Sequence, residues 1–263
     1  MSQQDSDKIR GERLKDKVAL VTGFGAGIGK GCALMFARQG AKVIGCDISP
    51  ESAQSTVTQA QSEQLNIENV SPCDLRDEQA VQQMMARVIE TYGRLDIVVN
   101  AAASAVFSWV EEMTYTDWRF TLEAELDTVF LVNKAAWPYL KASDGASIIN
   151  FASANAYVAL EGSAALAHCA GKGGVLAMSR QLAMEGAPHG IRVNTISPGM
   201  IITEATKPVL EQEGFIDNVM AKNMLKRLGK PEDIAWCAVY LGSNESTYVT
   251  AADFSVDAGA TAW

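Results

Sequence analysis

Histidine is scarce in this chain, and its cysteines are few and scattered. Only two histidines occur, His168 and His189, and they lie too far apart in the sequence to indicate a metal site. The five cysteines are odd in number and include no C-x-x-C pair, so neither a disulfide framework nor a zinc site is expected. We therefore expect no bound metal and a reducing compartment, the cytoplasm.

Basic residues are also in deficit, with 22 Lys and Arg against 31 Asp and Glu and a net charge of −9. Nucleic acids and anionic membranes attract proteins through basic patches, so we expect neither as a partner. No run of about 18 apolar residues occurs, which argues against a transmembrane helix. The polar start lacks the apolar segment of a signal peptide. We expect a polar tail over residues 1–14 and a single domain over residues 15–263.

Short apolar runs alternate with helical patterns along residues 15–263. Strands of this kind, joined by crossover helices, pair in parallel and form a sheet with helices on both faces. Residues 198–218 have weak periodicity, and we expect there a substrate-covering loop with short helices. The expected strands are 18–21, 41–47, 69–73, 95–100, 147–152, 191–196 and 253–256, and the expected helices are about 32–40, 51–64, 78–91, 115–140, 164–185 and 231–241.

A glycine-rich turn lies between the first expected strand and the first expected helix. It reads T-G-F-G-A-G-I-G, and it contains Gly23, Gly25, Gly27, Ile28 and Gly29. Glycines here permit a tight turn and let main-chain N–H groups approach a pyrophosphate at a helix N-terminus. The alternative is a glycine-rich turn without a ligand, but the strand–turn–helix context favours a dinucleotide. The fold expected is therefore α/β, a Rossmann-type doubly wound parallel sheet flanked by helices on both faces.

Asp47 ends the second expected strand and is followed by Ile48. A carboxylate at this position accepts hydrogen bonds from the adenosine ribose and repels a 2′-phosphate. Neither the glycine turn nor the residues directly after Asp47 supply an arginine that would neutralise such a phosphate. These features favour NAD over NADP. The alternative is a surface aspartate that caps the next helix, a role that Ser49 could also fill.

Further motifs give a resemblance to the short-chain dehydrogenase/reductase family over nearly the whole chain. The glycine turn matches T-G-x-x-x-G-x-G, Lys172 matches the lysine of Y-x-x-x-K, and Ser153 ends the fifth expected strand. This resemblance implies an NAD-binding site and a catalytic serine and lysine. The cofactor-binding residues that it implies are Gly23, Gly25, Gly27, Ile28, Gly29, Asp47, Ile48, Asp74, Leu75, Asn100, Ala101, Ala102, Lys172, Pro198, Gly199, Ile201 and Thr203.

The chain departs from the family pattern at two catalytic positions. The family tyrosine, four residues before Lys172, is replaced by His168, and the helix asparagine of the family aligns with Glu125. Imidazole needs less tuning than a phenol to accept a proton near neutral pH. A neutral His168 beside the Lys172 ammonium would favour alcohol oxidation over ketone reduction. Glu125 would offset the lysine charge and partly restore the basicity of His168.

Two other interpretations of these residues stay open. A chain that has lost the tyrosine could be a catalytically inactive NAD-binding subunit that stabilises an active partner. The set Ser153, His168 and Glu125 also resembles a hydrolytic triad, although no G-x-S-x-G elbow surrounds the serine.

The expected function is hydride transfer between NAD and a secondary alcohol or ketone, with oxidation favoured. The substrate is expected to be a small or medium-sized, largely apolar hydroxy compound, because no basic cluster marks a site for an anionic group. The long helices expected near residues 118–137 and 164–185 are apolar over more than one stripe, so each needs two partners. In the family such helices form dimer interfaces, and we expect a homotetramer or homodimer, with a hetero-oligomer containing an active family member as the alternative.

Overall fold

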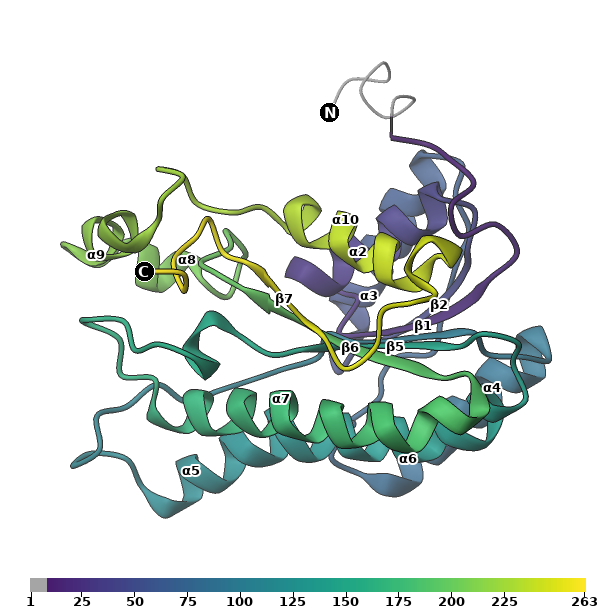
Figure 1. Cartoon of the computed structure of the whole chain (residues 1–263), viewed down its shortest axis with the longest axis horizontal. Coiled ribbons are helices and arrows are strands. Elements are labelled where there is room, and N and C mark those ends of the chain that lie inside the picture. Colours follow the sequence, from purple (N-terminus) through teal and green to yellow (C-terminus); the bar gives the residue numbers. More distant parts are fainter. Residues whose placement is uncertain (1–8) are drawn as a thin grey trace.

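The computed structural model describes residues 9–263, and their seven strands form one parallel sheet (Figure 1). The strand order is β3-β2-β1-β4-β5-β6-β7, so the order reverses between β1 and β4. This confirms the expected Rossmann-type doubly wound arrangement. The strands are β1 (Val18–Thr22), β2 (Lys42–Cys46), β3 (Ile67–Asn69), β4 (Ile97–Asn100), β5 (Ser147–Phe151), β6 (Arg192–Pro198) and β7 (Asp253–Val256).

Helices cover both faces of the sheet (Figure 1). The helices α2 (Gly27–Arg38), α3 (Pro50–Ser62) and α10 (Pro231–Gly242) lie on one face. The helices α4 (Glu78–Tyr92), α6 (Thr128–Lys141) and α7 (Leu166–Gly186) lie on the other. Strands β1, β4, β5 and β6 are buried along their whole length, as expected for parallel strands covered on both faces.

The third strand lies earlier in the chain than expected. The sequence predicts a strand over residues 69–73, but β3 ends at Asn69. Hydrogen bonding to β2 continues irregularly, from Val70 N–H to Gly45 and from Cys73 N–H to Asp47. Pro72 lies between these two residues and has no N–H group to donate, so it interrupts a regular ladder.

The polar tail is expected over residues 1–14, and the structure describes this stretch from residue 9 onward. Residues 1–8 lie outside the described residues, but Leu14 is fully buried in the core beside α2. Main-chain hydrogen bonds join Gly11 to Arg38 and Leu14 to Gln39. Residues 9–14 therefore pack against the domain, because Leu14 and the partly buried Ile9 contact its core.

The long helix expected over residues 115–140 contains a short π-helical segment. Helix α5 (Tyr115–Leu122) continues into this π segment (Glu123–Asp127) and then into α6. Such segments insert an extra residue and frequently occur at functional sites. Glu125 lies in the middle of the segment and is buried.

Residues 198–222 carry the short helices that the sequence predicts for this region. They are α8 (Lys207–Leu210) and α9 (Phe215–Lys222), and Figure 1 shows them beyond the ends of β6 and β7. Among residues 9–263, no helix combines the length and apolar character needed to span a bilayer.

Candidate active site

Two adjoining cavities lie at the carboxyl ends of the strands, where the strand order reverses between β1 and β4. One has a volume of about 470 Å³ and is lined by the glycine turn, Asp47 and Asp74. The other has a volume of about 510 Å³ and is lined by Ser153, His168 and Lys172. Ile28, Ala101 and Thr203 line both. In open α/β sheets, ligands bind at this reversal of strand order.

The glycine turn is built so closely that side chains would not fit. A Cβ atom on Gly29 would lie 2.1 Å from the carbonyl oxygen of Gly23, and one on Gly23 would lie 2.7 Å from Cα of Ala102. Gly23 and Gly27 also have positive φ angles of 66° and 53°. The α2 N-terminus has no side-chain cap and no acidic residue in its first turn, so its N–H groups and dipole are available to an anion. These features fit a bound diphosphate.

Asp47 directly follows β2, and its carboxylate joins the end of this strand to the glycine turn. One carboxylate oxygen accepts a hydrogen bond from Gly25 N–H at 2.9 Å, and the other accepts one from Ser49 N–H at 2.9 Å. The α3 cap is Ser49, whose hydroxyl accepts from Ser52 N–H. Asp47 is therefore not the helix cap, and its carboxylate lines the cavity beside the exposed Ile48.

Asp74 and Leu75 line the same cavity as Asp47. The Arg76 guanidinium pairs with Asp74 at 2.7 Å, and this hydrogen bond lowers the pKa of the Asp74 carboxyl. The positive charge of Arg76, which also lines this cavity, is therefore already paired with the Asp74 carboxylate.

Asn100 lines neither cavity. Its side-chain amide is buried and donates hydrogen bonds to Asn133 and Asn150 at 2.9 and 2.8 Å. Ala101 and Ala102, which follow it, do line the cavities, and their N–H groups donate to the Thr22 hydroxyl. Asn100 thus fixes the end of β4, and the two alanines form the wall.

Ser153, His168 and Glu125 form a continuous chain of hydrogen bonds. His168 Nδ1 lies 2.8 and 3.0 Å from the two Glu125 oxygens, and its Nε2 lies 3.3 Å from Ser153 Oγ. A carboxylate only accepts, so in the neutral ring the hydrogen is on Nδ1 and Nε2 is the acceptor. The side chain of His168 is 17% exposed and that of Glu125 is 3% exposed, so the imidazole is the more accessible of the two, although both residues line the larger cavity.

Lys172 lies on α7, one helical turn after His168, and its side chain is buried. Its ammonium donates to the Phe151 carbonyl at 3.3 Å and lies 3.9 Å from a Glu125 oxygen. Burial lowers the pKa of the Lys172 ammonium, and the Glu125 carboxylate opposes that shift. Glu125 therefore lies between a cation and the imidazole that it orients.

The π segment and α7 bring these groups together from distant parts of the chain. A Cβ atom on Gly171 would lie 3.2 Å from a Glu125 oxygen, so the absence of a side chain there leaves room for the carboxylate. Ser153 follows β5, and its hydroxyl also accepts a hydrogen bond from Asn155 N–H at 3.1 Å.

The segment after β6 closes the site from the opposite side. Pro198, Gly199 and Ile201 line the larger cavity, and a Cβ atom on Gly199 would lie 2.7 Å from Cα of Asp257. Thr203 approaches Gly27 closely enough that a Cβ atom there would lie 3.2 Å from its methyl group. This segment therefore contacts the glycine turn directly.

Comparison with known proteins identifies the family. The model of the family described as Enoyl-(Acyl carrier protein) reductase matches residues 23–261. The 3-oxoacyl-(acyl-carrier-protein) reductase FabG of Thermotoga maritima is 34% identical over 247 residues, which cover 94% of this chain and 98% of that protein. The chain belongs to the short-chain dehydrogenase/reductase family.

Two further proteins match this chain over nearly its whole length, one by sequence and one by structure. The NAD-dependent glycerol dehydrogenase of Listeria innocua is 32% identical over 249 residues, covering 94% of this chain and 95% of that protein. The crystal structure of gox2181 superimposes with a TM-score of 0.91 at 30% identity, covering 98% of this chain and 99% of that chain. The relatives from Thermotoga maritima and Listeria innocua are named as a reductase and a dehydrogenase, and this short-chain dehydrogenase/reductase is likewise an oxidoreductase.

Several residues of this family member's larger cavity are not predicted from its sequence. The Phe107 ring lies 5.6 Å from the His168 ring, centroid to centroid, at an interplanar angle of 39°. Asn155, Val158 and Leu160 also line the cavity. Phe107, Val158 and Leu160 lie in loops without periodicity, and Asn155 lies in a short 3-10 helix directly after Ser153. Only the position of Asn155, two residues after Ser153, was a usable signal.

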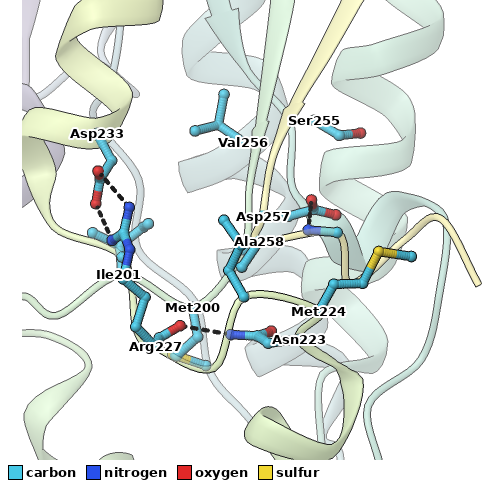
Figure 2. A pocket seen from close by; sticks show the side chains of 14 residues that line it. Met200, Ile201, Asn223, Met224, Arg227, Asp233, Ser255, Val256, Asp257 and Ala258 are labelled. Atoms are coloured by element: carbon cyan, nitrogen blue, oxygen red, sulfur yellow. Dashed lines mark hydrogen bonds and ion pairs between the residues drawn. The ribbon is translucent and has the colours of Figure 1, made fainter.

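A third cavity, of about 420 Å³, lies behind the segment after β6 of this short-chain dehydrogenase/reductase (Figure 2). It shares Met200, Ile201 and Asn223 with the larger cavity. Its polar side chains have partners, because Arg227 pairs with Asp233 at 2.7 Å and Asn223 donates to the Arg227 carbonyl. We interpret the paired residues around this cavity as the support that holds the segment after β6 in place. Among residues 9–263, no three metal-ligating side chains cluster.

Proposed function

We propose that the chain is an NAD-dependent dehydrogenase that oxidises a secondary alcohol to a ketone. The observation that carries this proposal is the orientation of His168, whose Nδ1 is held by Glu125 and whose Nε2 approaches Ser153. That arrangement leaves a basic nitrogen and a hydroxyl facing one cavity, as a proton acceptor for an alcohol requires.

His168 is proposed to take the place of the family tyrosine, four residues before Lys172. The Ser153 hydroxyl accepts from Asn155 N–H and donates to His168 Nε2. When an alcohol binds, this hydroxyl would turn its hydrogen to the substrate oxygen and leave Nε2 open to the proton of the alcohol. His168 Nε2 removes the hydroxyl proton, and the Glu125 carboxylate stabilises the imidazolium that forms. NAD, when bound, would supply the hydride acceptor for the carbon that bears this alcohol hydroxyl. Oxidation is the proposed direction because Glu125 holds Nδ1 and thereby presents Nε2 as a proton acceptor.

NAD is proposed as the cofactor because Asp47 lies in the cavity where the adenosine ribose is expected. The carboxylate would accept from ribose hydroxyls and oppose a 2′-phosphate. The glycine turn would hold the diphosphate through its N–H groups, Asp74 and Leu75 would flank the adenine, and Lys172 would hold the nicotinamide ribose. Pro198, Gly199, Ile201 and Thr203 would contact the carboxamide.

The substrate is proposed to be a small alcohol or ketone. The larger cavity has apolar walls, including Phe107, Val158 and Leu160, and a polar end at Ser153 and His168. The relative from Listeria innocua, an NAD-dependent glycerol dehydrogenase, supports a compact hydroxy compound. A panel of short secondary alcohols and diols therefore tests the proposal first.

The test measures NADH formation by the wild type, His168→Ala, His168→Tyr and His189→Ala over that panel. We expect the wild type and the exposed-site control His189→Ala to be active, and His168→Ala to lose at least about 100-fold in kcat. An inactive wild type with an active His168→Tyr variant would contradict a catalytic role for His168.

An inactive wild type with an active His168→Tyr variant would favour the alternative of a non-catalytic NAD-binding subunit. The comparisons give no support for that alternative. The distinction is direct, because a non-catalytic subunit would bind NADH without turning over any alcohol. Titration of NADH fluorescence measures that binding separately from activity.

A homotetramer or homodimer is proposed from the helices beside the site. Phe130 on α6 and Met184 on α7 are 50% and 60% exposed, although such side chains are costly to leave in water. Sedimentation equilibrium tests this oligomeric state.

A cytoplasmic location is proposed because all five cysteines are free, and fractionation of the source cells tests it.

A further inference from the structure

We propose that Ser153 is also a nucleophile, and that the cofactor-free protein hydrolyses small activated esters. This activity differs from hydride transfer and requires neither NAD nor a metal. It follows from the geometry of Ser153, His168 and Glu125, which have the roles of nucleophile, base and orienting acid.

The distances satisfy the requirements of such a triad. Ser153 Oγ lies 3.3 Å from His168 Nε2, within the loose range found before substrate binds. His168 Nδ1 lies 2.8 Å from Glu125 Oε1, so the carboxylate fixes the tautomer that leaves Nε2 basic. Asn155 N–H donates to Ser153 Oγ at 3.1 Å, which stabilises negative charge on that oxygen.

The surroundings can accept a small ester. Ser153 and His168 both line the cavity of about 510 Å³, which exceeds the size of an acetyl or butyryl ester. Ala154 follows Ser153 and lines the same cavity. In hydrolases the N–H of the residue after the nucleophile helps to bind the oxyanion, and Ala154 has that place in the chain.

The reaction balances without a redox partner. Ser153 Oγ forms a bond to the ester carbonyl carbon, His168 takes the hydroxyl proton, and the alcohol leaves with that proton. Water, deprotonated by His168, then attacks the acyl group on Ser153. The acid is released, and Ser153 and His168 return to their starting states.

Bound cofactor should block this activity. The two cavities adjoin and share Ile28, Ala101 and Thr203, and the nicotinamide is expected between Ser153 and the segment after β6. Ester hydrolysis should therefore fall as NADH is added, with half-inhibition at the concentration that half-saturates NADH binding.

The experiment measures p-nitrophenyl acetate hydrolysis by the cofactor-free protein. We expect the wild type to exceed both Ser153→Ala and His168→Ala by at least about 100-fold. His189→Ala is the control for ester cleavage by a surface imidazole, and it should match the wild type. Circular dichroism checks that each variant folds.

A fluorophosphonate probe tests the nucleophile directly in the wild-type protein. Intact mass and peptide mapping should show one adduct, on Ser153, formed more slowly when NADH is present. No adduct, an adduct on another residue, or wild-type hydrolysis by Ser153→Ala would overturn the proposal. Because this readout needs neither alcohol nor NAD, it separates failure here from failure of the dehydrogenase proposal.

Discussion

Glu125 accepts a hydrogen bond from His168 with both carboxylate oxygens, at 2.8 and 3.0 Å from Nδ1. The two residues are 43 positions apart and meet where the π segment packs against α7. The Lys172 ammonium lies 3.9 Å from the same carboxylate. A single buried acid thus offsets a neighbouring cation and fixes the tautomer of the imidazole.

Replacing Glu125 with glutamine should lower kcat by about 100- to 10,000-fold, because a neutral amide neither fixes the tautomer nor stabilises an imidazolium. KM for the alcohol should change little, since Glu125 is proposed to act through His168. Steady-state kinetics with the best alcohol of the panel measures this. Glu123→Gln, an exposed neighbour paired with Arg119 at 3.4 Å, should remain within about two-fold of the wild type. Equal losses in both variants would contradict the role given to Glu125.

Asp47→Ser should move cofactor preference from NAD toward NADP. The substitution removes a negative charge that would face a 2′-phosphate, and such like-charge contacts cost several kcal/mol. We expect the ratio of kcat/KM for NAD to that for NADP to fall by about 100-fold. Asp144→Asn, an exposed position in the loop before β5, serves as the control. An unchanged ratio in Asp47→Ser would place the adenosine ribose elsewhere.

The central strands could be predicted from sequence because each is a run of buried apolar residues. Strands β1 and β5 satisfy that condition except at the buried polar residues Thr22, Ser147 and Asn150. Strand β3 does not, because its three residues go from buried to exposed at the sheet edge. The apolar Val70 and Cys73 moved the predicted strand to residues 69–73, a range that contains Pro72, where regular pairing cannot continue.

The positions of the site residues could be predicted where sequence spacing on one element determines them, but not where tertiary packing determines them. Lys172 and His168 are four residues apart on one helix, so their proximity follows from helical geometry. The π segment around Glu125 leaves no trace in the hydrophobic pattern, and the direct contact between Glu125 and His168 depends on it. Sequence also suggested that Asn100 contacts the cofactor, whereas its side chain lies in a buried cluster with Asn133 and Asn150.

Gly25→Ala should weaken NAD binding without unfolding the protein. A Cβ atom there would lie 2.8 Å from Oδ2 of Asp47 and 2.8 Å from Cβ of Ser52, so the Asp47 carboxylate must move. We expect KM for NAD to rise at least about 10-fold, equivalent to ~1.4 kcal/mol, while kcat at saturating NAD changes little. Gly173→Ala is the control, because nothing lies within 4 Å of a Cβ atom on that helical glycine. A normal KM in Gly25→Ala would show that Asp47 does not position the cofactor.

The stability of the chain should depend on pH through the pair formed by Glu63 and Arg38. Their side chains are largely buried and lie 2.8 Å apart, joining the ends of α2 and α3. The hydrogen bond from Arg38 lowers the pKa of the Glu63 carboxyl. The unfolded chain therefore binds more protons at this group, so its contribution is complete above the ordinary carboxyl pKa and is lost as pH falls.

Glu63→Gln should accordingly destabilise the protein at pH 7 by about 2 kcal/mol, since Arg38 would lose a charged partner. The deficit should shrink as pH falls below about 4.5, where this carboxyl of the unfolded wild-type chain takes up a proton. Urea unfolding at pH 7, 5 and 4 measures the difference. Glu90→Gln removes an exposed partner of Arg87 at 2.6 Å and should cost less than about 0.5 kcal/mol at every pH. If the Glu63→Gln deficit were constant from pH 7 to 4, packing rather than charge would account for the contribution of Glu63.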